Sequence, residues 1–236
     1  MFSPLARNRS PELMDDPGLP QDEHSKALAG LARINRLSAA AAPIWRQIRS
    51  LAARTQLRKR PLTLIDVASG SSDLLRALDR KARSARIELG LTATDISQAA
   101  LDIAAALSRG TSIAFLRHDI LDRQLPKSAD IVTNSLFLHH LDPPQVVLAL
   151  RRMMDATDRL LIVHDLRRTR RGLMLARVIP KLLTTSRVVH VDAVRSVHGA
   201  YTCAELADMA NAAGLKGARI HTTFPQRMLL TWERPA

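Results

Sequence analysis

From Leu62 onward the chain alternates short apolar runs with amphipathic segments, and this pattern restricts the fold more than any other feature. Amphipathic helices are predicted between or after these apolar runs, at 74–85, 97–108 and 143–155. The polar stretch 119–128 fits a helix less well. Strands that alternate with helices predict an open parallel sheet covered by helices on both faces. The strand candidates are LTLIDVA (62–68), LGLTATDI (89–96), SIAFLRHDI (112–120), ADIVTNSLFL (129–138) and RLLIVHDL (159–166).

The two ends of the chain follow other patterns. Near the C-terminus, a helix ended by Gly214 precedes two runs, 215–224 and 226–234, that are close enough to pair as antiparallel strands. Residues 1–21 predict an irregular arm. Apolar spacing from Asp22 to about Arg60 predicts two helices with a break near Ser38.

We therefore expect an α/β fold: a Rossmann-like, open, mostly parallel sheet with an antiparallel C-terminal strand pair and an N-terminal helical cap. The predicted division places the arm and a helical lid in residues 1–60 and the ligand-binding domain in residues 61–236. A chain of 236 residues suits one such domain with a helical extension.

Cysteine usage and hydropathy exclude several classes of protein. A single cysteine, Cys203, excludes an internal disulfide and a cysteine-built zinc site. No compact spacing of other ligand residues appears, so no metal site is predicted. No apolar run is long enough to span a bilayer, and the N-terminal residues lack the apolar stretch of a secretory signal. We expect a cytoplasmic protein.

The charge balance is strongly basic, with 35 Lys and Arg against 22 Asp and Glu, for a formal net charge of +13. Such a surface suits a nucleic acid, an anionic lipid or an acidic partner, but solvated arginine-rich helices give the same balance. Aromatic residues make up only 3% of the chain, so the stacking platforms of single-strand binders are scarce. A small-molecule partner is favoured over a nucleic acid.

Acids or amides stand at consecutive strand exits. In open α/β sheets, ligands bind beyond the carboxyl ends of the strands, so these side chains are candidate ligand contacts. The turn after the first strand, DVASGSSD, has one glycine, Gly70, and lacks both the phosphate-loop and the dinucleotide fingerprints. The strand-exit residues are Asp66, Asp95, Asp119, Asn134 and Asp165.

Four runs resemble the motifs of class I S-adenosylmethionine-dependent methyltransferases: LIDVASGSSDLL, TATDIS, RHDILD and NSLFLHHL. The resemblance covers residues from about 60 to the C-terminus and implies S-adenosyl-L-methionine as cofactor. It departs from the family at Ala68 and Ser72, where glycine is usual. The cofactor-binding residues that the resemblance and the strand exits imply are Asp66, Ala68, Ser69, Gly70, Asp95, Ile96, Asp119, Ile120, Asn134, Ser135 and Arg33.

The implied roles differ along this set. Asp66 would contact the loop amides and the cofactor's ammonium group, and Asp95 would accept from the ribose hydroxyls. Asp119 would accept from the adenine amine, with Ile120 packed on the ring. Asn134 and Ser135 would line the methionine side. Arg33 or Arg36, on the first N-terminal helix, is a candidate partner of the cofactor's carboxylate.

His139 and His140 are the candidate catalytic residues, because imidazole titrates near neutral pH and can take a phenolic proton. Neighbours on a helix point about 100° apart, so only one is expected to face the cleft, and His140 is the first candidate. Both could instead cap or pack at the next helix, and methyl transfer can proceed through orientation alone. A loop containing His190, Asp192 and His198 is expected to roof the acceptor pocket.

The ends of the chain, including PELMDDPGLP, VHDLRR and PQRML, are similar to small-molecule methyltransferases found beside type III polyketide synthases. This implies O-methylation of a hydroxyl on a phenolic or polyketide-like acceptor. Two alternatives stay open. The basic charge suggests an RNA methyltransferase, and the altered glycine loop suggests a cofactor-binding regulatory module without turnover.

Overall fold

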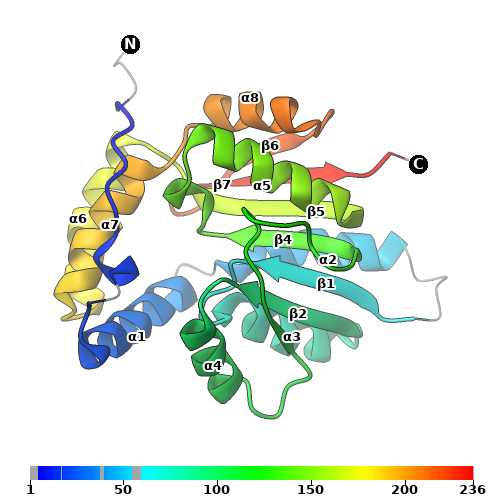
Figure 1. Ribbon diagram of the computed structural model, residues 1–236, viewed down its shortest axis with the longest axis horizontal. Helices are drawn as coiled ribbons and strands as arrows, with labels where there is room; N and C mark the ends of the chain where they lie inside the picture. Colours follow the sequence, from blue (N-terminus) through cyan, green and yellow to red (C-terminus); the bar gives the residue numbers. More distant parts are fainter. Residues whose placement is uncertain (1–4, 17, 38–39, 55–59, 236) are drawn as a thin grey trace.

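A seven-stranded sheet with the order β3-β2-β1-β4-β5-β7-β6 forms the centre of the protein (Figure 1). The computed structural model describes residues 5–16, 18–37, 40–54 and 60–235. Strands β1 to β5 pair in parallel, and β7 is inserted antiparallel between β5 and β6. The predicted fold class is confirmed. The strands are β1 (Leu62–Val67), β2 (Leu89–Asp95), β3 (Ala114–Arg117), β4 (Ala129–Ser135), β5 (Thr157–Leu166), β6 (Arg219–Thr223) and β7 (Arg227–Glu233).

Helices cover both faces of the sheet, as the alternation of strands and helices predicts. On one face α5 and α8 pack on a core that includes Val132 and Val163, and on the other α2 and α3 pack on Leu64 and Ile131. Because successive strand residues point to opposite faces, each buried strand supplies both cores. The helical elements are η1 (Leu13–Asp15), α1 (Gln21–Leu37), α2 (Ala41–Arg54), α3 (Asp73–Ala85), α4 (Gln98–Leu107), η2 (Leu138–His140), α5 (Pro143–Asp155), α6 (Arg170–Leu183), α7 (Arg187–Gly199) and α8 (Cys203–Ala213).

Helix α2 belongs to the core of the sheet. Ile44 and Ile48 are fully buried, and Leu51 is nearly so. The division at residue 60 stays a prediction, although α2 packs with the sheet; an amphipathic pattern alone does not reveal which surface will cover a helix. Only the arm and α1 are left to act as a lid, and that role stays a prediction. The predicted break near Ser38 lies outside the described residues.

Two segments differ from the predicted elements. Residues 119–128 form turns and no helix, although Ile120 and Leu125 reach the core from them. Pro126 and the short polar side chains around it favour turns over a helix. The expected loop at 190–198 is instead part of α7, which begins after Ser186, whose hydroxyl accepts from the Val189 N–H. Its valines have low helix propensity, which obscured the helix in the sequence.

Helices α1, α6 and α7 form a layer beyond the carboxyl ends of the parallel strands, at the left of Figure 1, and the N-terminal arm runs along α7. The Asp192 carboxylate on α7 accepts from the backbone N–H groups of Leu13 and Met14 at 2.8 and 2.9 Å. The Asn8 N–H donates to the His198 carbonyl at 3.0 Å. The arm is thereby fixed across the strand ends. Within the described parts of the chain, no helix is long and apolar enough to cross a membrane.

Candidate active site

The loop between β1 and α3 holds three residues in the left-handed backbone region: Ala68 (φ 53°), Gly70 (φ 51°) and Ser72 (φ 58°). This region costs a residue with a Cβ atom about 1–2 kcal/mol. The loop is nevertheless fixed by hydrogen bonds. The Ser69 N–H donates to the Thr94 carbonyl at 2.9 Å, and the Gly70 N–H donates to the Asp95 carboxylate at 2.8 Å. The altered residues therefore keep a tight turn at the end of β1.

Asp95 joins two loops at the end of β2. Its Oδ2 atom accepts from the Gly70 N–H, and its Oδ1 atom accepts from the Ser97 N–H at 2.9 Å. The side chain stays half-exposed. Ile96, the next residue, is 59% exposed, although isoleucine is usually buried. An accessible carboxylate beside an exposed apolar side chain suits a ligand with hydroxyls and a flat apolar ring.

Asp66 and Asn134 place unpartnered oxygen atoms at neighbouring strand ends. The Oδ1 atoms of both side chains are buried and have no hydrogen-bond partner among the described residues, while the Asn134 amide nitrogen donates to the Val67 carbonyl at 2.7 Å. Burial is the main cause that raises the pKa of Asp66 to about 7; a hydrogen bond from Ser69 opposes the rise, and the charge of Asp95 adds to it. Buried acceptors of this kind require a donor, so these two atoms fit a ligand that carries N–H or O–H groups.

The other predicted cofactor-binding residues contact parts of the protein itself or lie half-buried. The Asp119 carboxylate accepts from the Leu121 N–H at 2.7 Å and is half-buried. The Ile120 side chain is 4% exposed and packs in the main core, so its contact with an adenine ring stays a prediction. Ser135 is half-buried at the end of β4. Arg33 is exposed and donates to the Leu183 carbonyl, which ties α1 to the end of α6.

The contact predicted between Asp66 and the amides of its loop is not the one that forms. The amides of Ser69 and Gly70 are taken by Thr94 and Asp95, because the tight turn directs them toward β2. Ser69 hydrogen-bonds to the Asp66 carboxyl group, and the Oδ1 atom of Asp66 has no partner among the described residues.

His139 is held by Asp165 in the interior of the protein. Its Nδ1 atom lies 2.6 Å from the Asp165 Oδ1 atom, and the Leu138 N–H donates to the Oδ2 atom at 2.7 Å. Burial opposes the charge on Asp165, but the charge of His139 and its hydrogen bond outweigh this effect and lower the pKa of the carboxyl group. A neutral imidazole that donates from Nδ1 keeps a lone pair on Nε2. The Nε2 atom of His139 is therefore the ring nitrogen that Asp165 leaves unoccupied.

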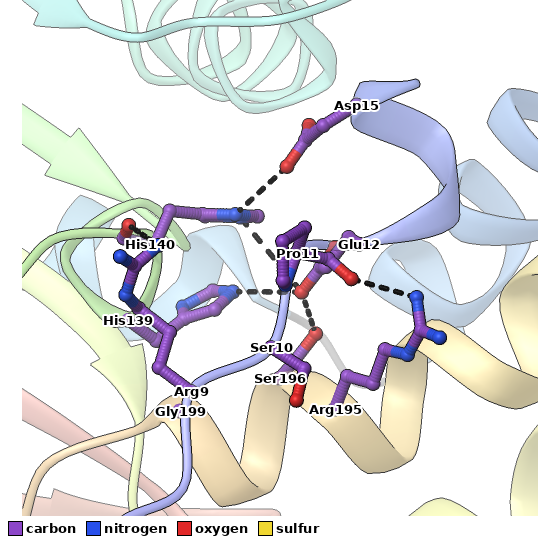
Figure 2. A pocket seen from close by; sticks show the side chains of 10 residues that line it. All are labelled: Arg9, Ser10, Pro11, Glu12, Asp15, His139, His140, Arg195, Ser196 and Gly199. Atoms are coloured by element: carbon purple, nitrogen blue, oxygen red, sulfur yellow. Dashed lines mark hydrogen bonds and ion pairs between the residues drawn. The ribbon is translucent and has the colours of Figure 1, made fainter. Parts of the chain in front are cut away.

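His139 and His140 both line one cavity, and their ring centroids are 4.3 Å apart (Figure 2). The Nδ1 atom of His140 is 3.4 Å from the Asp15 Oδ2 atom. Burial lowers the pKa of His140, but the hydrogen bond to Asp15 and the charges of Glu12 and Asp15 more than compensate and raise it. The expectation that only one histidine faces the cleft is wrong. The two belong to a single 3-10 turn, η2, and their tilted rings both reach the cavity.

The arm closes this cavity, which measures about 90 Å³. Pockets for small organic ligands usually span about 300–1,000 Å³, so this cavity is too small for such a ligand while the arm lies in this position. Glu12 and Asp15 of the arm were not predicted as site residues. In the sequence they stand in a Pro-rich, charged stretch far from the histidines, and only the fold brings them together. The lining residues are Arg9, Ser10, Pro11, Glu12, Asp15, His139, His140, Arg195, Ser196 and Gly199.

Residues 64–159 match a family model described as a methyltransferase domain. This segment begins in β1, ends in β5 and contains all of the strand-end residues except Asp165. Residues 64–159 therefore form a methyltransferase domain, and the protein has the fold of class I S-adenosylmethionine-dependent methyltransferases. A search of curated proteins found no match.

Solved structures share the fold of this methyltransferase at low sequence identity. The plantazolicin methyltransferase BamL, in complex with a triazolic desmethylPZN analog and SAH, is 14% identical with a TM-score of 0.66 over 89% of this chain and 90% of its own. An O-methyltransferase family 2 protein from Planctomyces limnophilus, in complex with apigenin, is 19% identical with a TM-score of 0.65, over 93% of this chain and 63% of its own.

A third similar structure is the magnesium protoporphyrin IX methyltransferase ChlM from Synechocystis with bound SAH. It is 16% identical with a TM-score of 0.55 and matches over 94% of this chain and 91% of its own. The three structures hold chemically different acceptors or none, so the shared fold leaves the acceptor of this methyltransferase open.

Proposed function

We propose that this methyltransferase transfers the methyl group of S-adenosylmethionine to a hydroxyl oxygen of a small aromatic or polyketide-like acceptor. The donor supplies a methyl group on a sulfonium. Attack by oxygen forms the C–O bond, breaks the C–S bond and leaves a neutral thioether.

The strand ends supply groups for the donor. Asp95 is accessible and would accept from the ribose hydroxyls, and Ile96 offers an exposed apolar surface for the adenine ring. The unpartnered oxygens of Asp66 and Asn134 would accept from the ammonium group directly or through water. The SAH bound in BamL and ChlM supports the same assignment.

The observation that carries the O-methylation is the contact between His139 and Asp165. Because the Nδ1 atom of His139 contacts Asp165 at 2.6 Å, its Nε2 atom is the nitrogen left for an acceptor hydroxyl at the cavity beyond the end of β4. A base there can remove the proton of an acceptor hydroxyl as the oxygen attacks the methyl group. Asp165 is a positioning residue that also stabilises the imidazolium.

His140 plays the complementary part. Its raised pKa favours the protonated ring, which donates a hydrogen bond to an oxyanion better than it removes a proton. His139 is therefore the proposed base, and His140 the proposed donor to the phenolate. The O-methyltransferase family 2 protein in complex with apigenin, a phenol, supports a phenolic acceptor.

Turnover assays test this assignment. The purified protein would be incubated with S-adenosylmethionine and a panel of phenols and alkylpyrones, and the products analysed by mass spectrometry and NMR. We expect an O-methyl product, and a loss of kcat of roughly 10²–10⁴-fold in His139→Ala without a change in SAH affinity. The loss should shrink for acidic phenols, which arrive ionised. N-methylation, C-methylation or methylation of RNA in place of phenols would overturn the proposal.

A further inference from the structure

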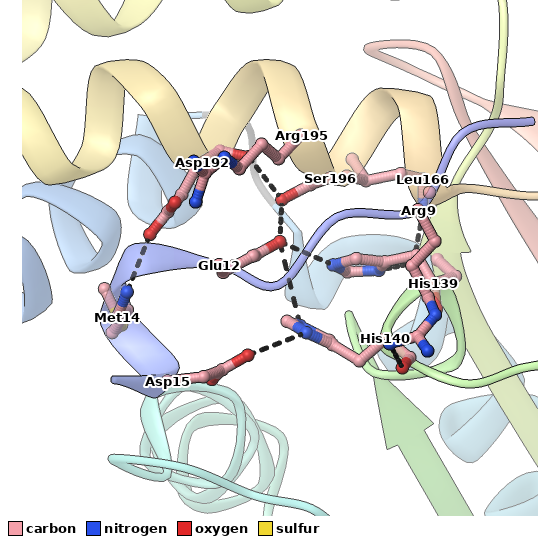
Figure 3. A network of polar contacts seen from close by, with 12 residues as sticks. Arg9, Glu12, Met14, Asp15, His139, His140, Leu166, Asp192, Arg195 and Ser196 are labelled. Atoms are coloured by element: carbon pink, nitrogen blue, oxygen red, sulfur yellow. Dashed lines mark hydrogen bonds and ion pairs between the residues drawn. The ribbon is translucent and has the colours of Figure 1, made fainter. Parts of the chain in front are cut away.

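Glu12, His139 and His140 direct three ligand atoms at one point beside the cavity (Figure 3). The Glu12 Oε1 atom lies 3.7 Å from the His139 Nε2 atom and 4.0 Å from the His140 Nε2 atom. All three atoms lie within 4.8 Å of one another. Ligands of a tetrahedral ion with bonds of about 2.0–2.1 Å stand about 3.4 Å apart. The three side chains therefore need only a small inward movement to share an ion.

The opposite nitrogen of each ring is held by a carboxylate, which is an independent observation. The Nδ1 atom of His139 is 2.6 Å from Asp165, and that of His140 is 3.4 Å from Asp15. Metal-binding histidines commonly donate their second N–H to a carboxylate in this way, which fixes the tautomer and the ring. The Nε2 atoms of both rings therefore face the Glu12 Oε1 atom, which also accepts from the Ser196 hydroxyl. A metal ion bound between these atoms would displace the proton from His140, because imidazole binds a metal in its neutral form.

We propose that Glu12, His139 and His140 bind a divalent first-row transition metal ion. Two imidazoles and one carboxylate suit Zn²⁺ and its neighbours in the series, whereas Mg²⁺ and Ca²⁺ prefer oxygen ligands alone. The remaining position faces the cavity of about 90 Å³, which has room for water.

The charges around the cluster favour a cation. The carboxylates of Glu12, Asp15 and Asp165 surround the two rings. Arg9 lines the same cavity, but its guanidinium is paired with Asp142 at 2.9 Å, so its charge is largely compensated. Arg195 donates to the Pro11 carbonyl, which positions the arm beside Glu12.

The ion would fasten the arm, because Glu12 comes from the arm and both histidines come from η2. An ion on the Nε2 atom of His139 also removes the lone pair that takes the acceptor's proton. The ion-bound protein is then a closed, inactive form; this consequence rests on the proposed function, whereas the binding of the ion does not.

Metal titrations of the full chain test the site directly. Zn²⁺ would be titrated in competition with a chromophoric chelator, and Co²⁺ by its visible absorption, which reports coordination geometry. We expect one equivalent, bound at least roughly 100-fold more weakly in Glu12→Gln and His140→Ala and roughly 10–100-fold more weakly in Asp15→Asn. His221→Ala, which changes an exposed histidine on β6, is the matched control and should bind as the wild type does.

Hydrogen exchange of the arm gives a second readout that needs no turnover. We expect Zn²⁺ to slow amide exchange in residues 8–16 of the wild type and not of Glu12→Gln. Absence of binding, or binding that is unchanged in both Glu12→Gln and His140→Ala, would overturn the proposal. If the wild-type protein turned over no acceptor, the proposed function would fail but the proposed metal site would not. Neither the metal titration nor the hydrogen exchange uses an acceptor.

Discussion

The Nδ1 atom of His139 and the Oδ1 atom of Asp165 are 2.6 Å apart, although His139 follows β4 and Asp165 lies near the end of β5. The parallel pairing of β4 with β5, in which Ser135 lies opposite His164, brings the two strand ends together. The same carboxylate accepts from the Leu138 N–H, so it orients both the turn and the ring. The geometry of the candidate base is therefore built into the register of the sheet.

Asp95→Ala should weaken binding of SAH by about 1.5–3 kcal/mol, the usual value for a hydrogen bond to a charged group. The side chain is half-exposed at a strand end, so the variant should remain folded. Isothermal calorimetry measures the change. Asp102→Ala, which removes an exposed acid on the neighbouring helix α4, is the control and should leave affinity unaltered. Wild-type affinity in a folded Asp95 variant would exclude the ribose contact.

Ala68→Gly should stabilise the protein. At φ 53° the alanine Cβ costs about 1–2 kcal/mol, whereas the extra freedom of glycine in the unfolded chain costs about 0.4–1 kcal/mol. The free energy of unfolding in urea should rise by up to about 1 kcal/mol. Ala105→Gly, at an exposed helical position in α4, should instead lower it by about 1 kcal/mol. If both variants lose stability equally, the conformation of Ala68 is not strained.

Asp130 should make stability depend on pH in the acid range. Burial opposes its charge, but Arg60 and the Thr63 N–H outweigh this and lower its pKa to about 2. Because the folded pKa lies below the unfolded value, the stabilisation is complete above about pH 4 and is lost as the pH falls toward 2.

Asp130→Asn should therefore lower the free energy of unfolding by about 2–3 kcal/mol at pH 7, and by much less near pH 2. Urea unfolding at both pH values measures this. Asp158→Asn, at an exposed neighbour, provides the comparison. A difference that is independent of pH would mean that packing, and not ionisation, explains the effect.

The arm and α2 should respond differently to change. Ile48→Ala should lower the free energy of unfolding by about 2–5 kcal/mol, because the side chain is fully buried against the sheet. Removing residues 1–16 should leave the sheet folded, since none of the described residues 5–16 belongs to the two large cores, and should impair turnover. Circular dichroism melts and acceptor assays distinguish the two. A truncated protein with full activity would show that the arm is not a lid.

The sheet could be predicted from the sequence because each buried strand is a short apolar run followed by a polar residue. Both features can be seen in a few neighbouring residues. The sequence also pointed to His139 and His140. It could not show that α2 is core, since an apolar helical stripe fits a lid and a core equally well. The sequence could not identify Glu12 and Asp15 as site residues for a different reason. The arm brings them to the histidines by running along α7, and Asp192 fixes this path of the arm.

The contacts of the arm also bear on why the chain is so rich in arginine. Arg7 donates to the carbonyls of Leu141 and Gly199 at 2.7 and 2.8 Å, and Arg168, only 6% exposed, donates to those of Leu5 and Ala200. These guanidinium groups link loops through backbone oxygens, and each also pairs with a carboxylate: Arg168 with Glu205 at 2.5 Å and Arg7 with Asp142 at 3.7 Å. Their charges are therefore partly compensated and turned inward, away from a phosphate backbone. Some of the arginines behind the net charge of +13 therefore hold loops together. If the protein bound a polyanion, only the other basic side chains would release counterions from it.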